Sequence, residues 1–520
     1  MDRPAPSFRR ATAWSIAINA VSQVLSLGFS MLMADFFGAG EATDILYCCI
    51  GLVAVAGGIV QVANVNVLIP ETMRRRVGAG ETGSMAFANR FLALFLAVVL
   101  AAGILFLAFS VPLLRAWTRF PLSALDANRP ILFWMGLAFP LQLASQLMLD
   151  ILVSYRFLVL PATLACAGRL VNIAFVLLFH ARLGVVSVAA GLACGFAVQL
   201  ACNVWLLFRV VGWRLAWRTE IGKTVWRNLG WAEFGNVVGA AAGYFPVYLF
   251  SGIGSGWLTA LTYAQRLNGV PTELVTQQVS SAVAVQLNEL AAADRRDDLF
   301  RAYERACRLA VAALCPLAAL LALLAPDAVE TLFGYGKFQG APAARTAAMF
   351  AILAFSIPLW AVMLFNARLL VACQAIRYGV LWQTFSAAMN ILAVAAGVHF
   401  LGPCGYPVAW VAYIALYTLL VTCLSPLRFP GLPSWSIWRR YAVTTAGSLL
   451  LVWAVRRLRA GPLAGWAPWA GGSVCLAAFL LLAGLWYALC PPDRMARDET
   501  LGILRSLAGR WLSSKRGGKA

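Results

Sequence analysis

The sequence is poor in charge and in the residues that most enzymes use at an active site. Only 12% of its 520 residues are Asp, Glu, Lys or Arg, and it holds two histidines. It contains no Ser/His/Asp set, no cluster of metal ligands and no phosphate-binding loop with a lysine. These absences argue against an enzyme, an ATP-driven pump or a metal protein, and we expect no cofactor.

The cysteines show no pattern of a disulfide framework or a metal site. There are twelve, scattered singly or as the pair Cys48-Cys49, and none lies in a C-x-x-C spacing. Only Cys404 falls in a predicted outer loop. We therefore interpret the cysteines as small apolar packing residues.

What the sequence does have is long apolar runs. The hydrophobic share is 62% and the mean hydropathy is +0.79, and a helix needs about 20 apolar residues to cross a bilayer. The pattern predicts an all-α, polytopic membrane protein with about 14 transmembrane helices. The predicted spans are 13–36, 44–69, 85–114, 130–155, 160–181, 184–208, 229–253, 256–284, 305–327, 343–369, 379–400, 405–427, 441–455 and 468–490.

The basic residues predict an orientation in the membrane. The net charge of +20 is concentrated in alternate loops rather than in a nucleic-acid-binding patch, and we expect no nucleic-acid partner. Cytoplasmic loops are rich in Lys and Arg, so this pattern places both termini in the cytoplasm. Arg456, Arg457 and Arg459 are the main exception, because they would face outward between the last two spans.

The order of the spans predicts two lobes. Of the twelve spans before residue 428, six precede the basic loop around Arg209 to Arg227 and six follow it, and both sets open with a glycine-rich hairpin. Equal number and orientation favour a duplicated transporter with a cavity between its halves. We predict lobes at 1–215 and 216–428, followed by a last hairpin and a basic cytoplasmic tail at 429–520.

A few ionisable groups inside the spans mark candidate sites, since charge in the bilayer centre is costly. Arg266 lies in the eighth span, near a kink expected at Pro271. Its guanidinium suits a phosphate or diphosphate. The alternative is a structural ion pair with Glu233 or Glu273.

Other polar residues in the spans extend this candidate site. Arg169 is a second cationic candidate, and Asp150 could be a proton or cation site or the partner of an arginine. The amides could line a substrate path or form bonds between helices. Those we select are Asn64, Asn66, Asn236 and Gln265.

Three motifs resemble the MurJ/MviN lipid II flippases. They are FFGAGEATD from Phe36, YAQRLNGVP from Tyr263 and LFGYGKF from Leu332, in the same order and at similar spacing, and the likeness covers about 12–425. The resemblance implies two six-helix lobes around a central cavity, two further helices that form a groove for a polyprenyl tail, and alternating access.

The sequence departs from that family at charged positions. Arginines of the family's first two helices correspond here to Gln23, Phe29 and Gly57, and the acidic residue before the eighth-span arginine corresponds to Gln265. Arg266 and Asp44 are retained. Loss of three positive charges should weaken diphosphate binding unless another arginine such as Arg169 substitutes.

The resemblance leads to a prediction of function. We predict a flippase of the bacterial inner membrane that moves an undecaprenyl-diphosphate-linked saccharide, with lipid II as the first choice. Arg266 and Arg169 would bind the diphosphate, the amides would contact sugar or peptide, and Asp44, Glu273 and Asp150 would act in gating or coupling.

Other functions fit the same sequence. They are a flippase for exopolysaccharide precursors, a cation-coupled exporter of small molecules and, third, a polymerase or ligase that acts on lipid-linked sugars. The expected partners are the lipid-linked saccharide, membrane lipids and a coupling cation or the membrane potential, and we expect a monomer.

Overall fold

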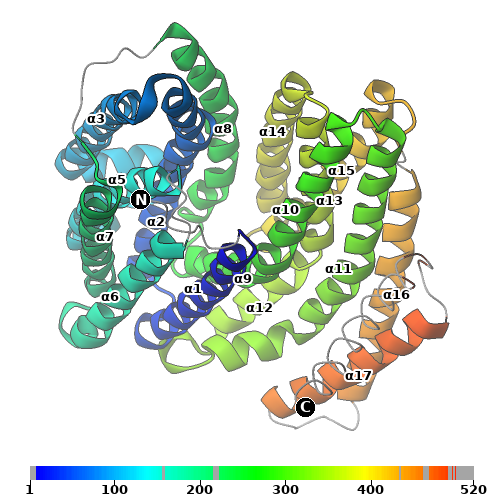
Figure 1. The fold of residues 1–520 in the computed structure, drawn as a ribbon. Coiled ribbons are helices and arrows are strands. Elements are labelled where there is room, and N and C mark those ends of the chain that lie inside the picture. Colours follow the sequence, from blue (N-terminus) through cyan, green and yellow to red (C-terminus); the bar gives the residue numbers. More distant parts are fainter. Residues whose placement is uncertain are drawn as a thin grey trace, which may run out of the picture. The chain divides into compact units, whose positions relative to one another are not determined.

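The structure, a computed structural model, is built from helices (Figure 1). It describes residues 8–154, 159–214, 222–432, 435–460, 468–489, 493, 495 and 498, and these residues include no β-strand. The first ten helical elements are α1 (Phe8–Phe37), α2 (Glu41–Ala63), η1 (Asn64–Leu68), α3 (Ile69–Trp117), α4 (Leu122–Ala127), α5 (Arg129–Ser154), α6 (Val159–Leu183), α7 (Val186–Leu206), η2 (Leu207–Val211) and α8 (Lys223–Phe250).

The remaining elements continue the same pattern. They are α9 (Trp257–Pro271), η3 (Thr272–Thr276), α10 (Gln277–Ala292), α11 (Arg296–Phe333), η4 (Gly336–Phe338), α12 (Ala341–Leu353), α13 (Ser356–Ala372), α14 (Ile376–Leu401), α15 (Gly405–Arg428), α16 (Trp435–Ala460) and α17 (Pro468–Leu489). Here η1, η2 and η3 are π-helical turns and η4 is a 3₁₀ turn. Each predicted span coincides with one of the long helices or with a broken pair, so the all-α polytopic fold is confirmed.

Length and composition qualify most of these helices as membrane spans. Among the described residues, nine helices are long and apolar enough to cross a bilayer, and a tenth span arises if α12 and α13, bent by 45°, count as one. The other four predicted spans correspond to α8, the broken pair α9–α10, α16 and α17.

Two helices extend well beyond their predicted spans. Helix α3 begins before the predicted 85–114, and its first part is separated from the apolar part by Gly80, whose φ of 72° breaks the helical geometry. Helix α11 likewise extends past both ends of 305–327. The reason is that hydropathy marks only the stretch that lies in lipid, whereas a helix can continue beyond it.

The chain divides into two compact units. The first comprises 1–263, 333–343 and 383–398, and the second comprises 264–332, 344–382 and 399–520. The division falls inside α9, between Tyr263 and Ala264. The predicted lobes at 1–215 and 216–428 stay a prediction.

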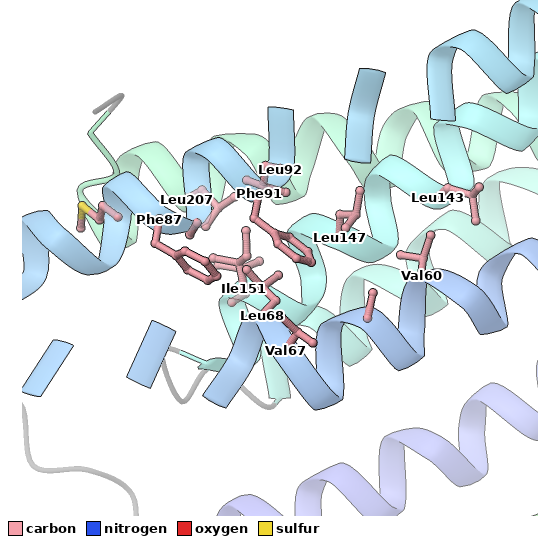
Figure 2. Close-up of a cluster of buried hydrophobic side chains, with 14 of the residues drawn as sticks. Val60, Val67, Leu68, Phe87, Phe91, Leu92, Leu143, Leu147, Ile151 and Leu207 are labelled. Atoms are coloured by element: carbon pink, nitrogen blue, oxygen red, sulfur yellow. The ribbon is translucent and has the colours of Figure 1, made fainter. Parts of the chain in front are cut away.

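The first unit packs around a cluster of apolar side chains (Figure 2). Leu147 and Ile151 of α5 meet Phe87 and Phe91 of α3, and Val60 of α2 lies on the same cluster. Helices in lipid gain little from the hydrophobic effect, so close packing of this kind is a main source of their association. The cluster fixes α2, η1, α3 and α5 as one body, on which several of the predicted site residues lie.

Large apolar side chains also point away from the packed interior. Leu178, Phe400 and Leu427 are each more than 70% exposed on helices that qualify as spans. Such exposure would be unfavourable in water and is expected against acyl chains. The surface of these helices therefore agrees with a multi-pass membrane protein.

Candidate functional site

Arg266 lies on a helix that is followed directly by a π-turn. Helix α9 ends at Pro271, and the π-turn η3 carries Glu273 before α10 begins. Proline removes a backbone donor, and π-turns frequently occur at functional sites. Helix α9 passes into the π-turn at Pro271, little more than one turn after Arg266. The kink expected from the sequence stays a prediction.

Polar bonds hold α9 on both sides of Arg266. The Gln265 amide donates to the hydroxyl of buried Tyr406 on α15 at 2.8 Å. Asn268 donates to Ser356 Oγ on α13 at 3.3 Å. Arg266 is half-buried and Glu273 is exposed. The two amide bonds thus fix the helix that presents the guanidinium.

Asp44 joins two helix ends in the first unit. Its carboxylate, on the first turn of α2 and only 2% exposed, accepts bonds from the backbone of Gly256 at 2.6 Å and of Thr259 at 2.7 Å. The Thr259 hydroxyl also donates to it at 2.5 Å. A carboxylate at a helix N-terminus satisfies donors that have no partner within the helix. Asp44 therefore caps α9 from another helix.

The motifs that suggested the family meet beside this cap. Tyr263 is fully buried, stacks on Phe333 with ring centroids 4.9 Å apart, and meets Phe338 edge-on at 5.0 Å. Two glycines allow the close packing: a Cβ at Gly38 (φ 66°) would lie 2.6 Å from the Lys337 carbonyl oxygen, and one at Gly336 would clash with Asp35. The three motifs therefore form one packed junction, which we call the motif junction.

A polar pair lies beside the apolar cluster of the first unit. Asn64, at the start of the π-turn η1, donates to the Asp150 carboxylate of α5 at 2.6 Å. Asn64 is fully buried and its amide oxygen has no hydrogen-bond partner among the described residues. The sequence suggested an arginine partner for Asp150, whereas the structure supplies an amide. The Asn66 side chain lies outside the described part.

The two remaining candidates are Asn236, which bonds within its own helix, and Arg169, which bonds to the first helix. Asn236 donates to Glu233, three residues earlier on α8, at 3.3 Å. Arg169 of α6 donates to the Ser22 carbonyl and hydroxyl oxygens of α1, both at 2.6 Å. Arg169 is exposed and lines a cavity of about 320 Å³ between α5, α6 and α7. It therefore carries positive charge next to Gln23.

The structure brings some candidates together and distributes others. Arg266, Gln265 and Glu273 share the broken helix of the second unit, and Asn64 and Asp150 are in direct contact. Asp44, Arg169 and Asn236 lie on separate helices of the first unit. Sequence reasoning missed Thr259 and Tyr406, because partners more than 100 residues away leave no local signal.

Taken together, apolar spans, a broken helix with an embedded arginine and polar groups inside the spans define a multi-pass membrane transport protein. The sequence profile of the lipid II flippase MurJ matches residues 33–460. The chain therefore belongs to the lipid II flippase MurJ family.

Solved structures agree on the fold. The lipid II flippase MurJ in an inward closed conformation is similar with a TM-score of 0.77 and 14% identity, over 92% of this chain and 99% of that one. An inward-facing multidrug resistance MATE family transporter is similar with a TM-score of 0.62 and 16% identity, over 79% of this chain and 95% of that one. A MOP superfamily transporter from Pyrococcus furiosus is similar with a TM-score of 0.59 and 14% identity, over 81% of this chain and 95% of that one.

Proposed function

We propose that this protein is a flippase that moves lipid II across the bacterial inner membrane by alternating access. The match to the MurJ family over 33–460 is the observation that carries the proposal. It favours lipid II over the exopolysaccharide precursor and over the small-molecule cargo of a cation-coupled exporter, both considered from the sequence. The likeness to MATE transporters supports the fold alone.

Arg266 is the proposed diphosphate ligand. It lies half-buried beside the break between α9 and α10, on a helix held by Gln265 and Asn268. A guanidinium offers five donors in a planar fork, which matches the oxygens of a diphosphate. π-turns inside helices frequently occur at functional sites, and Arg266 lies shortly before one.

Arg169 is the proposed replacement for cations that the family carries on its first helix. Its bonds to Ser22 hold a positive charge against α1 beside Gln23. The amides Asn64, Asn66, Asn236 and Gln265 would contact the sugar and peptide. Asp44, Glu273 and Asp150 would act in gating or in coupling to a cation or to the membrane potential, and the protein would work as a monomer.

Replacing Arg266 tests the proposal. Purified protein in vesicles should flip fluorescent lipid II, and Arg266→Ala should reduce flipping at least tenfold, because a charge-assisted hydrogen bond contributes about 1.5–3 kcal/mol. Arg129→Ala is the matched control, since Arg129 is exposed and pairs only with nearby Asp126 in the described structure. Full flipping by Arg266→Ala would remove Arg266 from the site.

A second assay separates the alternatives. The same vesicles should show no proton-coupled efflux of small cationic dyes and should flip lipid II in preference to exopolysaccharide precursors on the same carrier. Preferential flipping of such a precursor, or dye efflux without lipid II flipping, would contradict the proposed substrate.

A further inference from the structure

The cavity between α5, α6 and α7 is unusually polar for a site enclosed by membrane spans. Six of its lining residues are polar. Those of α5 and those of α6 are spaced so that they lie on one face of their helix. Helix α5 contributes three residues, α6 two and α7 one. They are Gln142, Ser145, Gln146, Arg169, Asn172 and Gln199.

The four amides of this cavity are not hydrogen-bonded to one another in the described part of the chain. The side chains of Gln142, Gln146 and Gln199 are half-buried, and none has a hydrogen-bond partner among the described residues. Asn172 is only 5% exposed, and its amide oxygen also has no partner in that part of the chain. Amides that bind helices together would be paired with one another, so these four serve a different purpose.

Two of the lining residues, Gly168 and Gly195, lie where α6 and α7 approach each other most closely in this cavity. Gly168 of α6 and Gly195 of α7 approach so closely that a Cβ on Gly195 would lie 2.5 Å from the Gly168 carbonyl oxygen. The volume of about 320 Å³ lies at the lower end of the range for ligand pockets, about 300–1,000 Å³.

We propose that this cavity binds the N-acylated sugar part of the lipid-linked substrate. An amide side chain both donates and accepts hydrogen bonds, as sugar hydroxyl and N-acetyl groups do. The acyl chains of lipids can do neither. Arg169 places one positive charge at the same wall. The inference rests on the proposed function and extends it, because it adds Gln142, Gln146 and Gln199 to the proposed sugar contacts and leaves the diphosphate to Arg266 and Arg169.

Three lipids that share one carrier test the subsite. They are undecaprenyl diphosphate, the same lipid bearing a single N-acetylglucosamine, and lipid II, with binding to the purified protein measured by native mass spectrometry. The sugar-bearing lipids should bind more tightly than the bare diphosphate. The double variant Gln146→Leu/Gln199→Leu should remove roughly tenfold or more of their affinity and leave undecaprenyl diphosphate within about twofold.

Controls separate loss of the subsite from loss of the fold. Gln61→Leu makes the same change at an exposed amide of α2 outside the cavity and should leave all three affinities unchanged. If the double variant melts below this control, each single variant is measured in its place. Arg266→Ala should weaken all three lipids alike.

The result distinguishes the subsite from the proposed function. Equal affinity for bare and sugar-bearing lipids, or a sugar preference that survives the Gln variants, would overturn the subsite. A different result would separate the two proposals: the unaltered protein fails to flip lipid II, but it prefers the lipid that bears N-acetylglucosamine, and the Gln variants abolish that preference. This result would overturn the proposed substrate and support the subsite.

Discussion

At the scale of single residues, the Asp44 carboxylate links α2 to the start of α9, beside the motif junction. It accepts two backbone bonds and one hydroxyl bond while almost fully buried. Asp44→Ala would leave these donors unpaired, and we expect a loss of about 2–3 kcal/mol in the free energy of unfolding. Asp44→Asn should retain part of the stability that Asp44→Ala loses. The measurement is thermal unfolding in detergent.

A matched substitution shows whether the cap is the cause. Thr259→Ser keeps the hydroxyl that bonds to Asp44 and should be nearly neutral, whereas Thr259→Val should destabilise. If Asp44→Ala retained full stability but lost flipping, the gating role proposed for Asp44 would hold without a structural one.

Glu71 gives a pH-dependent contribution outside the apolar spans. Burial alone would raise its pKa, but hydrogen bonds and charge from Arg75 and Arg74 outweigh burial, and the net pKa is lowered. The stability from this group is therefore complete above the unfolded pKa of about 4.3 and is lost as pH falls through the lower folded value.

Replacement of Glu71 tests that linkage. Glu71→Gln should cost about 1 kcal/mol at pH 7, a small value because Arg74 is largely exposed. The difference from the unaltered protein should shrink as pH falls below about 4. A difference that stayed constant down to pH 3 would show that the carboxylate charge contributes nothing.

At the scale of helices, an ion cluster ties the end of α17 to α11 and α16. Asp493, 2% exposed, accepts two bonds from Arg308 at 2.7 and 2.8 Å and pairs with Arg440 at 2.8 Å. Asp493→Ala would leave two partly buried guanidinium groups without this partner, and we expect a loss of up to about 3–5 kcal/mol. Limited proteolysis after α17 should accelerate. Unchanged cleavage would contradict the anchoring.

Helices were easier to predict than their junctions. Hydropathy located the spans because membrane insertion depends on local apolar length, and Pro271 marked the end of α9 because proline acts on its own helix. The bond from Thr259 to Asp44 spans 215 residues, and the amides around the α5–α7 cavity come from three helices. Such partners follow from packing, which no local pattern contains.

At the scale of the whole molecule, charge predicts how the chain crosses the membrane. Arg74 to Arg76, the loop near Arg209 and Arg295 to Arg301 follow even-numbered predicted spans, and an even total returns the chain to its starting side. We therefore propose that both termini face the cytoplasm. Arg457 lies over the Trp453 ring at 5.3 Å, an arrangement that lets the outward-facing basic end of α16 remain at the interface.

Reporter fusions test this topology in cells. Green fluorescent protein should fluoresce when joined after Ala520 or inserted after Arg76, and alkaline phosphatase should be inactive at the same positions. Phosphatase inserted at Gly340, after the ninth span, should be active, because that loop is predicted to lie outside. The contrary result is active phosphatase after Ala520 while Arg76 is cytoplasmic. The chain would then cross the membrane an odd number of times between Arg76 and Ala520, whereas the predicted number is even. One of α8, the α9–α10 pair, α16 or α17 would then not span, and fusions between these elements would identify it.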